Sequence, residues 1–258
     1  MSLTDELDPR SRFGEAWDLL FKPPVAHRGL WNGDGAPENS LAAFQAACAH
    51  GYGIELDVQL SADGEAMVFH DAKLERMTGA AGRLGDRTAA DLAELRLDGA
   101  DEGIPTLTEA LAVVGHRAMV MIELKTSAGE VGPLEKRVHE VLIDHNGPVA
   151  VIGFNPYSHA WFAQHHPMIL RGLDSYGYAD EGARKLAPEQ RQAYARLEHV
   201  SIARPHFLAL GVDMLPSPKA TDHRRKGMPV VAWTVRSAET WDGLKSHCDN
   251  LIFEGFAA

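Results

Sequence analysis

The 258-residue sequence predicts an α/β fold, a closed (β/α)8 barrel of the TIM type, from three observations. Short apolar runs rich in Val, Ile, Leu and Met recur along the chain, and most are separated by stretches with helical spacing. Alternating strands and helices indicate parallel strands joined by crossover helices. Nine candidate strands, in a chain about as long as one α/β barrel, suit eight barrel strands plus one extra strand better than an open sheet.

The candidate strands share their apolar, β-branched character. In chain order they are PPVAHRG (23–29), GIELDVQL (53–60), EAMVFHD (65–71), AMVMIELK (118–125), PVAVIGF (148–154), MILRGLD (168–174), HVSIA (199–203), PVVAWTV (229–235) and NLIFE (250–254). No internal repeat interrupts this order, and we expect a single domain over residues 1–258.

Capping residues mark several helix ends. Ser40, preceded by Asn39, can open a helix that stops before Gly51, where a left-handed cap fits. Thr106 and Glu109 have the spacing of a capping box. Ser237 can cap the last helix. These signals support helices between the candidate strands.

One connection is too short for a crossover helix. Only residues 61–64 separate the second and third candidate strands, and Asp63-Gly64 is a strong hairpin signal. The two strands should therefore be antiparallel. With the turn centred on Asp63, residue 60 lies near 65, and Glu55 comes level with His70.

Residues 72–105 carry a weaker pattern. This stretch contains several glycines, one short helix-like segment at 88–97 and no core strand. We interpret it as a small insertion over the barrel mouth.

Composition and charge narrow the classes of partner. The net charge is −11 and no Lys or Arg track is present, so nucleic acid and anionic lipid are poor partners and a small ligand is favoured. The sequence contains no run of about 18 apolar residues of the kind that would predict a membrane span. Two cysteines, Cys48 and Cys248, are too few for a disulfide framework. Because the first residues do not resemble a signal peptide, we expect a cytoplasmic protein.

Three carboxylates predict a cation site. Glu55 and Asp57 alternate in one strand and project to the same face, and Glu123 near the end of another strand supplies a third oxygen ligand. Hard oxygen ligands favour Mg²⁺ or Ca²⁺ over zinc, and Mn²⁺ is also compatible. For Glu55 and Asp57 alone, a solvated strand face is an equal alternative. The pair Glu123 and Lys125 repeats the pattern and favours the single divalent cation.

Two histidines end candidate strands, at the side of a barrel where active sites lie. His27 is followed by Arg28, and His70 lies at the level of Glu55. Although core or surface histidines are commoner, two histidines beside a metal-bound phosphoryl group can act as base and acid near neutral pH. Arg28 and Lys125 can offset the charge of phosphate oxygens.

Seven motifs carry a resemblance to a known family. They are HRG (27–29), PENS (37–40), IELDVQLSADG (54–64), VFHD (68–71), IPTLTEAL (104–111), IELK (122–125) and WTV (233–235). In this order they resemble the glycerophosphodiester phosphodiesterase family, over most of the chain. The resemblance implies a TIM-barrel phosphoric diester hydrolase with metal ligands at Glu55, Asp57 and Glu123. It also implies catalytic histidines at His27 and His70, and it implies phosphate contacts from Arg28 and Lys125.

The resemblance extends to four further residues. Glu38 and Asn39 would give polar support to the site, although Asn39 is equally well read as a helix cap. Phe154 and Trp233 would wall the pocket, although both also suit plain core. The chain departs from the family pattern at residues 152–154 and in the tail SHCDNLIFEGF (246–256). These departures leave the substrate preference open.

The resulting hypothesis is hydrolysis of a small glycerophosphodiester to sn-glycerol 3-phosphate and an alcohol. One alternative is a phospholipase D or lysophospholipase D that acts on a larger phosphodiester. Another is a catalytically inactive phosphodiester-binding barrel, which is disfavoured because all five metal-ligand and histidine positions are filled. The alcohol, the native metal, the histidine that acts as base, the oligomeric state and the pathway are left open.

Overall fold

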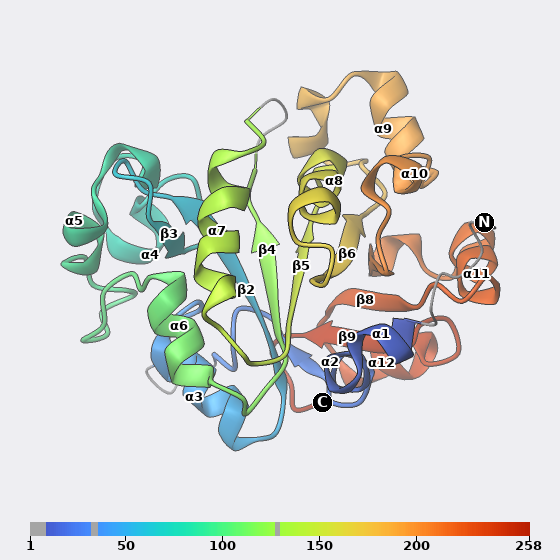
Figure 1. Ribbon diagram of the computed structural model, residues 1–258, viewed down its shortest axis with the longest axis horizontal. Helices are drawn as coiled ribbons and strands as arrows, with labels where there is room; N and C mark the ends of the chain where they lie inside the picture. Colours follow the sequence, from blue (N-terminus) through green and yellow to red (C-terminus); the bar gives the residue numbers. More distant parts are fainter. Residues whose placement is uncertain (1–8, 32–35, 127–129) are drawn as a thin grey trace.

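The computed structural model describes residues 9–31, 36–126 and 130–258, and its parallel strands close into a barrel (Figure 1). The strands of the barrel are β1 (Val25–Ala26), β2 (Gly53–Leu60), β4 (Val120–Leu124), β5 (Val149–Gly153), β6 (Leu170–Ser175), β7 (Phe207–Gly211), β8 (Val230–Val235) and β9 (Asn250–Phe253). Each pairs in parallel with its neighbours, and β1 pairs with both β2 and β9, which closes the ring. The predicted eight-stranded α/β barrel is confirmed.

The extra strand lies outside the ring. Strand β3 (Ala66–Val68) pairs antiparallel with β2, as the short connection predicts. The predicted register was wrong by one residue, since Leu60 pairs with Ala66 and not with residue 65. The cause is Ser61, whose backbone N–H donates to Glu65 O at 3.0 Å while its hydroxyl accepts from Glu65 N at 2.9 Å. This bonding places the turn within residues 62–64.

The helices mostly connect the strands and cover their outer side. They are α1 (Pro9–Phe13), α2 (Glu15–Phe21), α3 (Leu41–Ala49), α4 (Glu75–Thr78), α5 (Ala89–Ala93), α6 (Leu107–Val114), α7 (Pro133–Ile143), α8 (Pro156–His165), α9 (Pro188–Ala195), α10 (Val200–Ala203), α11 (Pro218–Arg225) and α12 (Ala238–Leu244). In contrast, α1 and α2 precede β1 and pack against the apolar cluster inside the barrel. Figure 1 shows α7 and α8 in front of the strands β4 to β6. No helix in the described part of the chain is long and apolar enough to cross a membrane.

The predicted helix caps are present. Ser40 accepts a hydrogen bond from Ala43 N at the start of α3. Thr106 and Glu109 form both bonds of a capping box at α6. Ser237 caps α12. Each cap satisfies N–H groups that the first helical turn leaves without an intrahelical partner.

One predicted strand was wrong. Residues 199–203 form the short helix α10, and the seventh barrel strand is β7, at residues 207–211. Val200 and Ile202 are β-branched and favour a strand locally, but packing against α8 holds this segment as a helix. The fold, and not local preference, selects the strand.

The core has two layers. One cluster fills the space between strands and helices and includes Phe44, Phe162 and Leu208. A second cluster fills the barrel interior and includes Met121, and Leu20 of α2 packs against it. A filled interior leaves the rim of the barrel as the place for a site.

The insertion has its own small core. Residues such as Met77, Leu84 and Leu92 pack with Met67 and Phe69 of the hairpin. In Figure 1 the helices α4 and α5 lie beside β3. The insertion is therefore anchored to the same hairpin that carries His70.

Candidate active site

A cavity of about 200 Å³ opens where the barrel strands end. It is lined by His27, Arg28, Glu55, His70, Glu123, Lys125, Ile152, Phe154, Asp174, Trp233, Thr234, Arg236 and Ile252. Several of these residues lie at or just beyond the carboxyl ends of strands, the face of a (β/α)8 barrel that carries active sites. The cavity brings eight of the eleven predicted site residues together.

Three buried carboxylates meet at this cavity. Asp57 of β2 pairs in register with Glu123 of β4, and Glu55 lies two residues before Asp57. One ligand oxygen from each of the three lies within 4.8 Å of the others. Their exposed fractions are 2%, 0% and 9% for Glu55, Asp57 and Glu123. This is the geometry that the sequence predicts for a cation site.

Two basic residues contact the carboxylates. Lys125 Nζ lies 2.9 Å from Asp57 Oδ1 and 2.8 Å from Glu123 Oε1. Arg28 Nε lies 3.4 Å from Asp57 Oδ2, and the Arg28 backbone N–H donates to Glu55 Oε2 at 3.0 Å. Lys125 and Arg28 therefore lie where they can also meet the oxygens of a bound anion.

The three buried carboxylates crowd one another. Burial, with Asp57 and Glu123 close by, raises the pKa of Glu55 well above its usual range. Burial also tends to raise the pKa of Asp57, but Lys125, His70 and Arg28 outweigh it and hold that pKa low. Glu55 Oε1 is buried without a hydrogen-bond partner among the described residues. An unsatisfied oxygen among crowded carboxylates is the donor set that a hard divalent cation fits.

The His27 ring is held by a carboxylate from the last strand. Its Nδ1 lies 2.5 Å from Oε2 of Glu254, and Glu254 Oε1 accepts from Arg236 Nε at 2.5 Å. The hydrogen bond from His27 lowers the pKa of Glu254 to about 2, against the effect of burial. His27 Nε2 lies 3.9 Å from Glu55 Oε2. The ring therefore presents Nε2 toward the carboxylates while Nδ1 is bonded behind it.

His70 has a similar arrangement at the end of the hairpin. Its Nδ1 lies 2.7 Å from Asp71 Oδ1, and Arg76 Nε of the insertion donates to Asp71 Oδ2 at 2.6 Å. Burial and Lys125 lower the pKa of His70, with Asp57 opposing them. Since Nδ1 is engaged, Nε2 is the ring atom left to exchange a proton.

Glu38 and Asn39 lie behind the carboxylates. Asn39 Nδ2 donates to Asp57 Oδ2 at 2.8 Å, and the Asp57 backbone N–H donates to Asn39 Oδ1 at 3.3 Å. The cap of α3 is Ser40 and not Asn39, so the Asn39 side chain is committed to the site. Glu38 accepts from Arg28 Nη1 at 2.8 Å and from Arg76 of the insertion.

Aromatic side chains form the apolar side of the cavity. Phe154 and Trp233 both line it, with ring centroids 5.6 Å apart and an interplanar angle of 80°. Both are half-buried and not plain core. They offer an apolar surface opposite the charged groups.

Asp174, Arg236 and Glu254 are among the lining or supporting residues that the sequence did not predict. Asp174 is 3% exposed, and burial with Glu123 close by raises its pKa well above the usual range. Glu254 directly follows β9, and Asp174 lies near the end of β6. A lone acid that ends an apolar run was the available signal, and it was the same signal that indicated Glu123.

Comparisons with known proteins point to one family. The sequence profile of the glycerophosphoryl diester phosphodiesterase family matches residues 27–252. A glycerophosphodiester phosphodiesterase of Caldanaerobacter subterraneus is 35% identical over 52% of this chain and 58% of the relative. Glycerophosphodiester phosphodiesterase 1 of Homo sapiens is 35% identical over 45% of this chain and 37% of the relative. The aligned part thus spans little more than half, or less, of these two relatives.

Solved structures show the same barrel. A phosphodiesterase of Oleispira antarctica, in complex with the product sn-glycerol-3-phosphate, has a TM-score of 0.78 at 26% identity. The match covers 93% of this chain and 94% of that one. A glycerophosphodiester phosphodiesterase of Thermotoga maritima has a TM-score of 0.71 at 25% identity and covers 90% and 94%. The chain therefore belongs to the glycerophosphoryl diester phosphodiesterase family.

Proposed function

We propose that this chain hydrolyses glycerophosphodiesters to sn-glycerol 3-phosphate and an alcohol. The observation that carries the proposal is one cavity lined by two histidines, each with its Nδ1 against a carboxylate, and by buried carboxylates that fit a cation. Membership of the family supports the proposal. The similar Oleispira antarctica protein, which binds sn-glycerol-3-phosphate as its product, supports the choice of substrate.

Glu55, Asp57 and Glu123 would hold one divalent cation, Mg²⁺ or Ca²⁺, with Mn²⁺ also compatible. When bound, the cation would act as a Lewis acid that stabilises negative charge on a nonbridging phosphate oxygen. Lys125 and Arg28 would add positive charge for the same phosphate group, since both already contact the carboxylate cluster.

His27 is the proposed general base. Because Glu254 accepts the proton on Nδ1, the tautomer with an unprotonated Nε2 is favoured. That Nε2 would take a proton from water or from the neighbouring glycerol hydroxyl. Glu254 would then stabilise the charged imidazolium, as the carboxylate does in a catalytic triad.

His70 is the proposed general acid. In the protonated ring, Nε2–H would protonate the leaving alkoxide while Nδ1–H donates to Asp71, a contact that opposes the lowering of the His70 pKa by burial and Lys125. The two histidines have matching carboxylate partners, so the reverse assignment of base and acid uses the same contacts.

Replacement of each histidine tests the mechanism. General acid-base help is worth ~10²–10⁴-fold, so His27→Ala and His70→Ala should each reduce turnover of glycerophosphocholine by about that factor. His116→Ala, at an exposed position outside the cavity, is the matched control and should keep normal turnover. Near-normal turnover in both site variants would refute the mechanism.

A larger substrate is the second candidate. A cavity of about 390 Å³ lies beside Glu38 and is lined in part by Trp31, Pro37 and Met77. The lining is mixed, since Glu38, Arg76 and Asp98 are charged, but its apolar part next to a site residue would favour the alternative of a phospholipase D or lysophospholipase D. Product analysis with glycerophosphocholine and with a lysophospholipid separates the two. Absence of turnover of either substrate with Mg²⁺, Ca²⁺ and Mn²⁺ would instead favour an inactive phosphodiester-binding barrel.

A further inference from the structure

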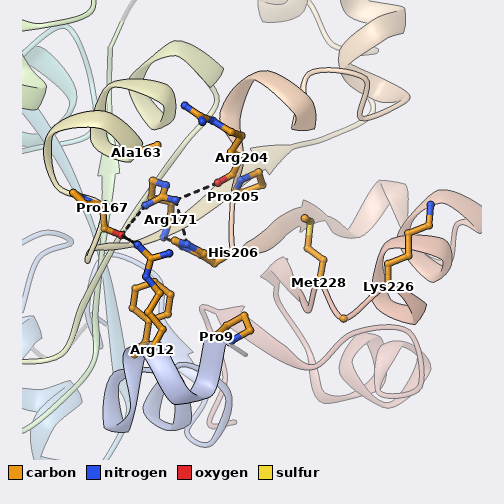
Figure 2. A pocket seen from close by; sticks show the side chains of 12 residues that line it. Pro9, Arg12, Ala163, Pro167, Arg171, Arg204, Pro205, His206, Lys226 and Met228 are labelled. Carbon is orange, nitrogen blue, oxygen red and sulfur yellow. Dashed lines mark hydrogen bonds between the residues drawn. The ribbon is translucent and has the colours of Figure 1, made fainter. Parts of the chain in front are cut away.

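Another cavity, of about 670 Å³, lies at the other end of the barrel from the candidate active site (Figure 2). Arg171 lines it from the beginning of β6, and His206 lines it from the position before β7. Arg12 of α1 and Met228, just before β8, close it from other sides. The candidate active site lies at the carboxyl ends of the strands, so the two cavities are separate.

The lining of this cavity is basic. Arg12, Arg171, Arg204 and Lys226 contribute to it, and none of its twelve lining residues is Asp or Glu. Lys226 pairs with Asp222 at 2.7 Å. Within the described residues, none of the three arginines forms an ion pair with a carboxylate. In a chain with a net charge of −11, three arginines at one cavity, without a carboxylate partner in the part of the chain that the structure describes, oppose the overall charge.

Arg171 is the buried member of the group. It is 5% exposed, and its guanidinium donates to carbonyl oxygens and faces a ring nitrogen. The contacts include Ile169 O at 3.1 Å, Arg204 O at 3.4 Å and His206 Nε2 at 3.1 Å. Its Nε is buried without a partner among the described residues. Burial, with Arg12 and Arg204 close by, lowers the pKa of Arg171 to about 10, so the group is still charged at neutral pH. Among the described residues, this buried charge has no counter-ion, which is costly for a charge removed from water.

Hydrogen-bond donors outnumber acceptors around Arg171. Figure 2 shows Arg12 and Arg171 converging on the carbonyl oxygen of Pro167, at 2.8 and 3.5 Å. The backbone N–H and the Nη2 of Arg171 face both ring nitrogens of His206, each at 3.1 Å. Burial, with Arg171 and Arg12 close by, lowers the pKa of His206 to about 3. A neutral imidazole accepts at only one nitrogen, so only one of these two contacts can be a hydrogen bond to the ring.

We infer that this cavity binds a small phosphate-bearing anion, at a site distinct from the candidate active site. A phosphate group offers several acceptor oxygens and a negative charge to balance the guanidinium groups of Arg12 and Arg171, and arginine is the residue best matched to its geometry. The organic part of a phosphate monoester would contact the apolar members of the lining, Phe13, Pro205 and Met228. The shared ligand chemistry is the phosphate group, whether as free phosphate or as a monoester.

Calorimetric titration of the full chain tests the inference without any turnover, so the result does not depend on the proposed function. The probes are inorganic phosphate and adenosine 5′-monophosphate, with chelator present to keep metal out of the candidate active site. The test variant is Arg12→Gln with Arg204→Gln, because both side chains are exposed and can be replaced without opening the core. The control, Arg96→Gln with Arg196→Gln, removes the same charge from exposed positions elsewhere.

For each probe, the control should have the same affinity as wild type, and the test variant should bind at least about tenfold more weakly. Tighter binding of the nucleotide than of inorganic phosphate would identify a monoester as the preferred ligand, and equal affinities would identify free phosphate. The inference is overturned if neither probe binds wild type at about 10 mM, or if the test variant binds as tightly as the control.

Discussion

His159 of α8 should make the stability of the barrel depend on pH. The side chain is 0% exposed, and its Nε2 lies 2.9 Å from the carbonyl oxygen of Gly153, the last residue of β5. Its Nδ1 is buried without a partner among the described residues. Burial lowers the pKa of His159 from 6.5 to about 4, although the bond to Gly153 opposes the shift. Gly153 directly precedes Phe154, so this histidine also supports the wall of the cavity.

The direction of this pH dependence follows from proton uptake by the unfolded chain. Unfolded His159 binds a proton below pH 6.5, whereas the folded side chain stays neutral down to about pH 4. Its contribution is therefore fully present above pH 6.5 and is lost as the pH falls toward 4. At about 1.36 kcal/mol per pKa unit, the shift contributes roughly 3 kcal/mol to the free energy of unfolding at neutral pH. About 2 kcal/mol of this contribution is lost by pH 5.

Urea unfolding at pH 7 and at pH 5 measures this loss. On going to pH 5, wild type should lose about 2 kcal/mol more unfolding free energy than His159→Gln, which keeps a donor for Gly153 but cannot titrate. His165→Gln replaces an exposed histidine of the same helix and should behave as wild type does. Equal pH dependence in wild type and His159→Gln would refute the reasoning.

Three other predictions concern the site and the core. A divalent cation at about 100 times its Kd should add about 2.7 kcal/mol to the free energy of unfolding, which a thermal scan would show as a rise in Tm of several degrees. Addition of chelator, or the substitution Asp57→Asn, should abolish this rise. Glu254→Gln should lower kcat by up to ~10²–10⁴-fold with little change in KM, because it removes the acceptor that orients His27; an unchanged kcat contradicts this role. Phe162→Ala, at a fully buried position, should cost about 3–5 kcal/mol in urea unfolding, and a loss below about 1 kcal/mol would contradict its place in the core.

Much of the fold could be predicted because, in most segments, the local sequence pattern favours the same element that the barrel contains. Runs such as residues 118–125 are apolar and β-branched, and they form strands in the barrel. The seventh strand was missed because its sequence, FLALG, is rich in Leu and Ala, which favour helices locally. The nearby segment 199–203 has β-branched residues and yet forms α10. Tertiary packing decided both segments.

The same distinction applies to the site. Glu55 and Asp57 could be paired from alternation within one strand, and Asp71 from its place beside His70. Glu254 is 227 positions from His27, and its role depends on the last strand docking against the first. No local pattern carries that information, so only the closed barrel reveals the contact.

Closure of the ring has a consequence for the order of assembly. The carboxylates of β2 and the nearby His70 come from one hairpin, a contact that is short in sequence and forms at low entropic cost. His27 is different: its backbone N–H donates to Phe253 O at 2.9 Å and its ring bonds to Glu254, across the seam between β1 and β9. A refolding chain therefore orients this histidine only when the seam closes. The rate at which turnover recovers during refolding would therefore report the pairing of β1 with β9, which follows formation of the hairpin.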